Sequence, residues 1–290
     1  MTTQTAQTAQ TATVVPIRAT AATPQPLRDS MTMLRRNLKH LLRYPSMSVS
    51  MVGMPVIFLL LFVYVFGSTL GDGLGGHGVP GGLGGHGGRG AYIDYVTPGI
   101  ILMTAVGAAT ATAVSVATDM TEGVVARFRT MAIARSSILT GHALGSLIMT
   151  LLAMAVVTGV ALLIGFRPDA NAVEWLAAIG LLALFTYAIA WLAVGMGLAA
   201  GGPESASNMP MPLLVLPFLG SGFVPTDSMP TALRWFAEYQ PFTPLIETLR
   251  GLLLGTPLHN SPAQAIGWCV GTLVLGYLWS KKLFSRDPSR

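Results

Sequence analysis

Long apolar segments separated by short polar ones dominate the pattern of this 290-residue chain. A helix that crosses a bilayer needs about 20 mostly apolar residues. Six segments meet or nearly meet this requirement, at residues 47–70, 96–117, 139–166, 173–200, 209–224 and 262–280. The pattern therefore predicts an all-α integral membrane protein with six transmembrane helices.

The fifth of these segments differs from the others because it is short and carries Pro210, Pro212 and Pro217. Proline lacks a backbone N–H and interrupts helices. A broken helix at membrane depth must be covered by protein or line a cavity, since free backbone groups cannot face lipid. We therefore expect 209–224 to be the least regular of the six spans.

The distribution of Lys and Arg predicts the orientation, because cytoplasmic segments carry an excess of these residues. With the amino terminus inside, only four of the 17 Lys and Arg residues fall outside, namely Arg89, Arg167, Arg234 and Arg250. Both termini are therefore predicted to be cytoplasmic, in a multi-pass protein of the cell membrane.

Composition agrees with this assignment, since 52% of the residues are hydrophobic and 10% are charged. Soluble domains carry about 25% charged residues. The net charge of +5 does not by itself indicate nucleic acid, and we predict no nucleic-acid partner. Residues 1–25 have neither the basic start nor the apolar core of a signal peptide. We expect a disordered cytoplasmic tail there and a transmembrane domain over 26–285.

Residues 26–45 alternate apolar and basic side chains at helical spacing. This pattern predicts an amphipathic helix in the inner interface, with its cations near anionic lipid headgroups. A generic anchor and a specific docking element both fit the pattern. The apolar residues are Leu27, Met31, Leu34, Leu38, Leu41 and Leu42, and the basic ones are Arg28, Arg35, Arg36, Lys39 and Arg43.

Residues 71–91 form a glycine-rich external loop with an imperfect repeat around His77 and His86. Two histidines can bind a metal ion weakly, but ordering so many glycines costs entropy. We favour a flexible spacer and expect no metal and no cofactor.

The main inner loop, 118–138, contains Glu122, Arg127, Arg129 and Arg135. Apolar residues between these charges allow a short helix that lies on the membrane surface and contacts a soluble partner. A solvated connector that only follows the positive-inside rule fits equally well. The second inner loop, 201–208, carries one acid, Glu204, and reads as a turn.

The external block, 225–260, is half-apolar and predicts two short re-entrant helices buried against other helices. Asp227 or Ser228 can cap a helix that begins around Pro230. A second helix is expected from Pro244, with Thr243 as its cap. On this second helix, Glu247 and Arg250 are spaced i, i+3 and can form an ion pair.

Motifs for catalysis and for ion-driven transport are absent from the chain. No lysine completes a phosphate-binding G-x-x-x-x-G-K-[ST] loop, and no His-Glu-x-x-His or Cys-x-x-Cys pair occurs. The inner half of the spans holds no acidic residue beyond Asp119 at a boundary, whereas ion-driven carriers place carboxylates within the bilayer. We therefore expect a protein that is not an enzyme and that receives its energy from another molecule.

Small residues gather in the second and fourth spans, around Gly107 and Ala111 and around Gly195 and Gly197. Small side chains allow helices to approach closely. Tight packing within one subunit and a seam between two copies both fit this pattern.

Four stretches resemble type-2 ABC transporter permeases, closest to the daunorubicin-resistance branch of actinobacteria, and the resemblance covers about residues 26–285. They are 92–99 at the start of the second span, the charged loop from Glu122 to Arg135, Pro203-Glu204 between the fourth and fifth spans, and the external block. The external block is the most specific of the four, and its motif positions are Pro225, Pro230, Pro241, Thr243, Pro244, Glu247 and Arg250. One departure is Met131-Ala132, which stands where a proline is common in the family.

The resemblance implies a permease subunit of an ATP-driven exporter, with a separate ABC ATPase subunit and a homodimer of permease chains. It implies export of a hydrophobic drug or antibiotic, with a lipid or polysaccharide as the alternative substrate. It also implies contact with the ATPase through the 26–45 helix and through Glu122, Arg127, Arg129, Arg135 and Glu204. The alternative from a different functional class is a membrane channel or a membrane enzyme that works without an ATPase.

Overall fold

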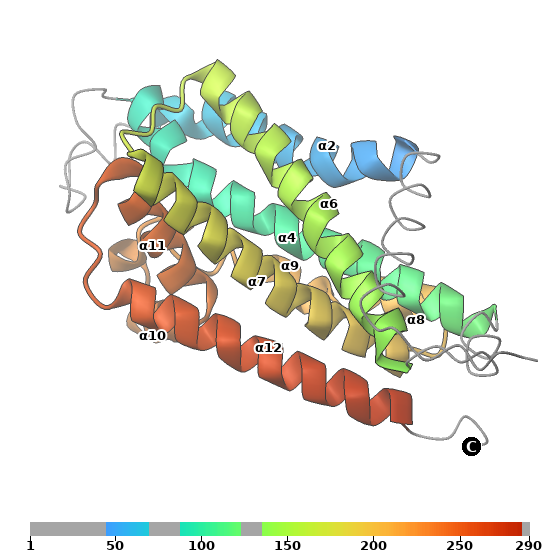
Figure 1. Cartoon of the computed structure of the whole chain (residues 1–290). Coiled ribbons are helices and arrows are strands. Elements are labelled where there is room, and N and C mark those ends of the chain that lie inside the picture. The colour runs from blue at the N-terminus through green and yellow to red at the C-terminus, as the bar shows by residue number, and fades with distance from the viewer. Residues whose placement is uncertain (1–44, 70–87, 123–134, 286–290) are drawn as a thin grey trace, which may run out of the picture.

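The computed structural model describes residues 45–69, 88–122 and 135–285. These residues form a bundle of five long helices with a set of short ones (Figure 1). Three predicted segments lie largely outside the described residues: the 26–45 helix up to residue 44, the 71–91 loop up to residue 87, and residues 123–134 of the 118–138 loop. The long helices are α2 (Pro45–Leu61), α4 (Arg89–Thr121), α6 (Arg135–Ile164), α7 (Ala172–Ala199) and α12 (Ser261–Ser285). The short elements are η1 (Phe62–Phe66), α8 (Pro203–Asn208), α9 (Met211–Val215), η2 (Thr226–Ser228), α10 (Thr231–Tyr239) and α11 (Phe242–Leu254).

Four helices of the described part are long and apolar enough to cross a membrane, namely Met51–Thr69, Arg89–Thr121, Leu139–Ile164 and Ala172–Ala199. They confirm the first four predicted spans as helices, although the second begins at Arg89 and not at residue 96. The last helix, α12, is 25 residues long but is not among these four. The total of six spans therefore stays a prediction.

The fifth predicted span, 209–224, is irregular, as its three prolines led us to expect. Only the five residues of α9 are helical within 209–224, and turns follow from residue 216. Three prolines explain the break, because each removes a backbone donor and clashes with the preceding turn. The irregular chain still runs from α8, past α9, to the end of the bundle that holds α10 and α11 (Figure 1).

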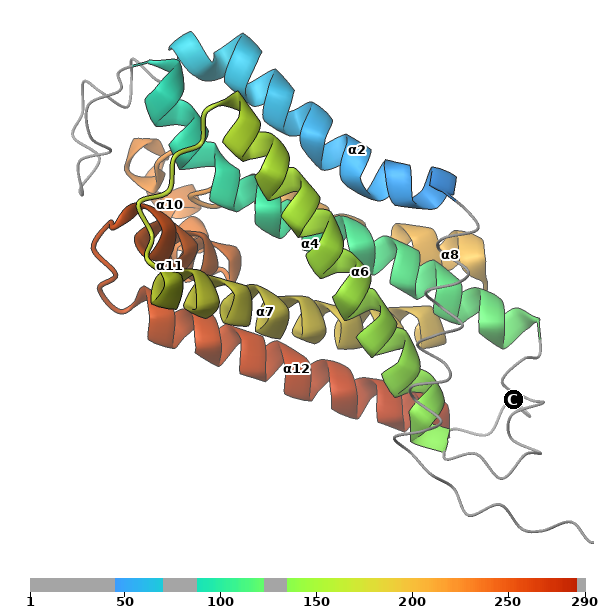
Figure 2. The same ribbon diagram turned by 45° about the horizontal axis from the view of Figure 1, so that its top comes forward.

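The two ends of the bundle hold different elements. The α8 end holds the start of α2, the end of α4, the start of α6 and the last turn of α12, and the α11 end holds α10 and α11 (Figure 2). Both described chain ends, at Pro45 and Ser285, therefore lie at the α8 end. This arrangement agrees with termini on one side of a membrane, while the side itself stays a prediction.

Helix α4 is the centre of the bundle, since it packs against α2, α6, α7, α8 and α11. Of its most apolar window, 72% is buried. Part of the small-residue pattern serves this packing, because a Cβ on Gly197 would lie 2.5 Å from the carbonyl oxygen of Ala113. Gly107 and Ala111, which lie on α4, are exposed. Packing within the subunit therefore explains the small residues of α7 but not those two of α4.

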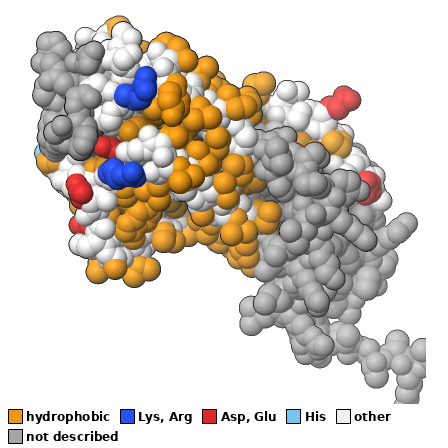
Figure 3. Space-filling view, turned by 90° about the horizontal axis from the view of Figure 1, so that it is seen from above, with side chains coloured by type: hydrophobic (Ala, Val, Ile, Leu, Met, Phe, Trp, Pro, Cys, Tyr) orange, Lys and Arg blue, Asp and Glu red, His pale blue; other side chains and the backbone are white. Residues whose placement is uncertain are grey.

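Exposed apolar side chains cover much of the outer surface. The most apolar windows of the first and third candidate spans are only 22% and 28% buried. In Figure 3 hydrophobic side chains occupy the middle of the viewed face, and acidic side chains lie toward its two ends. Soluble monomers rarely expose apolar surfaces of this extent, and this distribution is typical of a multi-pass membrane protein.

Candidate functional site

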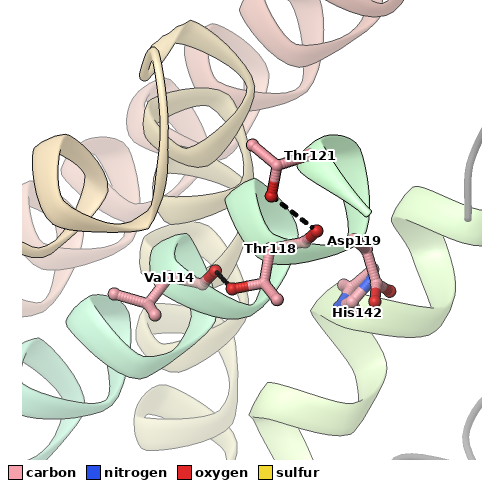
Figure 4. Close-up of polar contacts among 5 residues, drawn as sticks. All are labelled: Val114, Thr118, Asp119, Thr121 and His142. Carbon is pink, nitrogen blue, oxygen red and sulfur yellow. Dashed lines mark hydrogen bonds and ion pairs between the residues drawn. The ribbon is translucent and has the colours of Figure 1, made fainter. Parts of the chain in front are cut away.

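A polar contact joins α4 to α6 near the α8 end of the bundle. The Nε2 atom of His142 lies 3.1 Å from the Oδ2 atom of Asp119. His142 is 8% exposed, and the two side chains meet across the facing helices (Figure 4). The contact is an ion pair when the imidazole is protonated. It ties together the two helices that flank residues 123–134.

The last turns of α4 are held by threonine side chains that bond to their own helix. Thr118 Oγ1 donates to the carbonyl oxygen of Val114 at 2.9 Å, and Thr121 Oγ1 donates to that of Thr118 at 3.0 Å (Figure 4). Threonine commonly satisfies helix carbonyls in this way. A second link between α4 and α6 lies deeper in the bundle, where Thr112 Oγ1 donates to Ser146 Oγ at 2.7 Å.

The residues predicted to contact an ATPase fall near this end wherever the structure describes them. Glu122 is the C-cap of α4 and is exposed, and Glu204 is exposed in the first turn of α8. Arg135 is the first residue of α6, but its side chain is not described. Arg127 and Arg129 lie outside the described residues. Helix α8 packs against α4, so both acids belong to elements in mutual contact.

A second polar cluster lies at the α11 end and is centred on Arg250. The Nη2 atom of Arg250 donates to the carbonyl oxygens of Tyr95 and Ser221, each at 3.0 Å. Its guanidinium also lies 3.8 Å from the centroid of the Tyr95 ring, which is a cation–π contact. Arg250 is 6% exposed. This one side chain joins α11, α4 and the irregular segment that follows α9.

Other contacts of the same cluster hold the irregular segment against α11. Gln240 Nε2 donates to the carbonyl oxygen of Leu216 at 2.9 Å, and the backbone N–H of Ser221 donates to Thr243 Oγ1 at 3.2 Å. A Cβ on Gly220 would lie 2.3 Å from Gln240 Nε2. A larger residue at position 220 would therefore have to displace the Gln240 amide, which donates to Leu216.

The predicted ion pair between Glu247 and Arg250 is wrong. Arg250 binds the two carbonyl oxygens described above, and Glu247 Oε2 accepts a hydrogen bond from Ser261 Oγ at 2.8 Å. The spacing on the helix was correct, but burial gives each side chain a partner from another element.

The predicted caps are also wrong. Helix α11 begins at Phe242, so Thr243 lies inside its first turn, and Pro241 takes the N-cap position. Pro230 precedes α10 and provides no side-chain cap. The remaining motif prolines lie before η2, at Pro225, and in the buried first turn of α11, at Pro244.

The two residues expected to cap α10 make other contacts. Asp227 Oδ1 lies 2.8 Å from Arg234 Nη2, and Ser228 Oγ donates to the carbonyl oxygen of Pro225 at 2.7 Å. Arg234 Nε also donates to Glu238 Oε1 at 2.7 Å. That hydrogen bond and the nearby Asp227 carboxylate raise the pKa of Arg234 above its usual range. These contacts connect η2 to α10 at the exposed surface.

Sequence reasoning missed the contact between Asp119 and His142. Asp119 stood out as a lone acid at the end of the second span, but helical spacing cannot identify a partner on another helix. Within the described residues, no group of three His, Cys, Asp or Glu side chains is placed to hold a metal ion. The histidines of the glycine-rich loop, His77 and His86, lie outside these residues.

Comparisons with known proteins agree with this architecture. The family described as "ABC-2 type transporter" matches residues 29–254. The "Daunorubicin resistance ABC transporter permease protein DrrB1" of Streptomyces coeruleorubidus is 28% identical over 242 residues, which are 83% of this chain and 78% of that protein.

A second relative is the "Probable doxorubicin resistance ABC transporter permease protein DrrC" of Mycobacterium tuberculosis (strain CDC 1551 / Oshkosh). It is 24% identical over 180 residues, which are 62% of this chain and 65% of that protein. The family match includes α2, α4, α6, α7 and α11, and among these helices α4, α6 and α11 carry the two polar clusters. The chain therefore belongs to the ABC-2 type transporter family.

Proposed function

We propose that this chain is the permease subunit of an ABC exporter that moves a hydrophobic drug out of the cell. Membership of the family implies a partner ATPase, and the chain itself carries no phosphate-binding loop. The proposed substrate rests on one observation: 83% of the chain is similar to a permease named for daunorubicin resistance. A second relative is named for doxorubicin resistance.

We further propose that the α8 end faces the cytoplasm of the cell and the α11 end faces outward. In this arrangement the chain crosses the cell membrane six times, with the irregular 209–224 segment as the fifth crossing. The excess of Lys and Arg in the segments at the α8 end supports this orientation. The position of Pro45 and Ser285 at one end supports an even number of crossings.

In the proposed mechanism the ATPase acts on the connection between α4 and α6. Because the Asp119–His142 contact links these helices, a displacement of residues 123–134 moves them together and does not spread them apart. Glu122 and Glu204 supply exposed negative charge on neighbouring elements at this end. We propose that these acids, with Arg127, Arg129 and Arg135, bind the ATPase.

The working transporter in this proposal is a homodimer of permease chains with two ATPases. The exposed small residues Gly107 and Ala111 and the uncovered apolar faces of α2 and α6 support an assembly with a second copy or with lipid. Disulfide cross-linking of single cysteines introduced on α2 or α6 distinguishes a second copy from lipid, because only a contact with a second copy gives a cross-linked dimer.

The test is ATP-dependent uptake of daunorubicin into inverted vesicles that contain the permease with the ATPase with which it co-purifies. Uptake that needs both subunits supports the proposal. Full transport by the permease without any ATPase would overturn it, and so would an ATP-dependent complex that exports only a lipid or polysaccharide. Reporter fusions test the orientation, which fails if the two termini lie on opposite sides.

The coupling role is tested in the same vesicles with Asp119→His, His142→Asp and the double exchange. Each single variant places two like residues side by side, and we expect a loss of permease-stimulated ATP hydrolysis. The double exchange restores opposite partners and is expected to recover most of it. Glu238→Gln, which removes a carboxylate at the far end of the bundle, serves as the control. Equal activity of all four variants would exclude a coupling role for the pair.

A further inference from the structure

Buried polar atoms without a hydrogen-bond partner are concentrated in the polar cluster around Arg250. Within the described residues five buried side-chain atoms lack a partner, and three of them are the Nε atom of Arg250, the Oγ atom of Ser221 and the Oε1 atom of Gln240. These residues are 6%, 3% and 5% exposed, respectively. The other two atoms are the hydroxyl oxygens of Tyr92 and Thr150. Buried polar groups are normally paired with protein atoms or with ordered water, so three unpaired atoms in one cluster point to a ligand.

The three residues lie around one peptide of the irregular segment. The Nη2 atom of Arg250 donates to the carbonyl oxygen of Ser221 at 3.0 Å, and Nε belongs to the same guanidinium. The backbone N–H of Ser221 donates to Thr243 Oγ1 at 3.2 Å. A Cβ on Gly220 would meet the amide of Gln240 and would lie 2.8 Å from Thr243 Oγ1. The unpaired atoms therefore belong to side chains that surround the same short stretch of chain.

The other polar atoms of these residues are already bonded, and this determines what the unpaired atoms can bind. Gln240 Nε2 donates to the carbonyl oxygen of Leu216 at 2.9 Å, and a reversed amide would bring two acceptors together. Ser221 contacts Arg250 and Thr243 through its backbone, so its hydroxyl group serves neither contact. The cluster thus offers one guanidinium donor, one amide acceptor and one hydroxyl group that can donate or accept.

The charge of Arg250 is another reason to expect a ligand. Among the described residues, no carboxylate forms an ion pair with Arg250, and Glu247 accepts a hydrogen bond from Ser261 instead. The guanidinium is satisfied by two neutral carbonyl oxygens and the face of the Tyr95 ring. Burying a charge is costly unless it is well hydrogen-bonded. An acceptor at Nε would lower that cost.

We propose that the Arg250 cluster is a binding site for ordered water, held by Arg250 Nε, Ser221 Oγ and Gln240 Oε1. The ligand must accept a hydrogen bond from the guanidinium and donate one to the amide oxygen. An anion cannot donate to Gln240, and the charge of Arg250 repels a metal cation. Water does both, and a buried water typically makes about three hydrogen bonds to groups that otherwise lack partners. The inference holds whichever substrate the permease exports, because it concerns the contact of α11 with the irregular segment.

Replacing Ser221 with alanine distinguishes a hydrated site from a dry one by the sign of the effect. The change removes the hydroxyl group and keeps both backbone contacts. Loss of one partner of a bound water should raise the unfolding equilibrium constant of the full chain in mixed micelles about threefold to tenfold, the net contribution of one hydrogen bond. In a dry site the unpaired hydroxyl group is only a cost. An unchanged or lower unfolding constant in Ser221→Ala would therefore overturn the inference.

Thr150→Val is the matched control, since Thr150 also has an unpaired, buried hydroxyl group but lies in α6, outside the cluster. This variant should unfold like the unmodified chain or be more stable. Equal destabilisation by Thr150→Val and Ser221→Ala would mean that the loss is not specific to the Arg250 cluster, and would also overturn the inference.

X-ray hydroxyl-radical footprinting detects the water directly, because bound water gives rise to radicals beside buried side chains. Tyr95 is 2% exposed and its ring faces Arg250, so it should be oxidised in the native chain, and less so in Ser221→Ala. Trp191 is 3% exposed and belongs to a separate core cluster, and it should stay unmodified. Oxidation of Tyr95 no faster than that of Trp191 would show that no water is bound beside the guanidinium.

Discussion

Replacing Arg250 with methionine tests whether one buried guanidinium holds the α11 end together. Methionine has a similar length and no hydrogen-bond donor, so the change removes the bonds to the carbonyl oxygens of Tyr95 and Ser221. It also removes the cation–π contact at 3.8 Å from the Tyr95 ring. The apolar volume of the side chain is kept, and the variant reports on polar contacts more than on packing.

The expected loss follows from these contacts. The Ser221 carbonyl oxygen left without this donor costs about 1–3 kcal/mol, while that of Tyr95 costs less because it lies inside α4 and keeps its helical donor. The lost cation–π contact costs about 1–2 kcal/mol. Burying the arginine charge has its own cost of several kcal/mol, which the variant recovers in part. We therefore expect the free energy of unfolding to fall by roughly 2–4 kcal/mol. Arg250→Lys keeps a donor but not the fork of the guanidinium, and an intermediate loss is expected.

The measurement is unfolding of the purified permease in mixed micelles by a denaturing detergent, followed by fluorescence of the five tryptophans. Arg234→Met is the matched control, because Arg234 belongs to the same external block but pairs with Asp227 and Glu238 at the surface. Exposed pairs contribute little, so this variant should unfold like the unmodified chain.

An Arg250→Met variant as stable as the unmodified chain would refute the reasoning, since the contacts of the guanidinium would then add nothing to stability. Equal losses in Arg250→Met and Arg234→Met would refute it too. Such a result would mean that loss of positive charge, and not loss of buried hydrogen bonds, weakens the block.

Two further predictions concern α12. A Cβ on Gly276 would lie 2.7 Å from the backbone nitrogen of Leu192, so Gly276→Ala should separate α12 from α7 and cost about 1–3 kcal/mol in detergent unfolding. Gly271→Ala has open space around its new Cβ and should be neutral or stabilising by up to about 1 kcal/mol; a reversed order would contradict this packing. Cys269, the single cysteine, is buried, and mass spectrometry should find it unlabelled by maleimide until the chain unfolds. Rapid labelling of the native protein would show that α12 is not seated as described.

Hydropathy predicted the first four helices because lipid-facing segments must be apolar over a whole span. The same reasoning placed the start of the second helix too late. Residues 89–95 contain Arg89, Asp94 and two tyrosines, which lower the hydropathy of a segment that is nevertheless helical and largely buried. Helix α11 packs against α4, and a pattern along one segment contains no information about such a neighbour.

The path of the fifth crossing and the partners of Arg250 required the structure for a related reason. Three prolines indicated a broken segment, but the acceptors for Arg250 are backbone oxygens, which every residue carries. Nothing in the sequence distinguishes the carbonyl groups of Tyr95 and Ser221 from others. The i, i+3 rule therefore predicted Glu247, a charged side chain on the same helix, as the partner of Arg250. In the buried site the guanidinium instead donates to two backbone oxygens.

Both polar clusters include α4, and this has a consequence for how the two ends of the permease communicate. Tyr95 and Asp119 are separated by 24 positions, or about 36 Å along an α-helix, somewhat more than the hydrocarbon thickness of about 30 Å. Between these two residues α4 contains Pro98, three positions after Tyr95, and a proline inside a helix removes one hydrogen bond and allows a kink. We therefore expect a displacement at the Asp119 end to travel along the packed helix as far as Pro98, where α4 can bend before the movement reaches Arg250. In the proposed orientation, opening of the α11 end would require that α11 and residues 218–223 either follow α4 or release it.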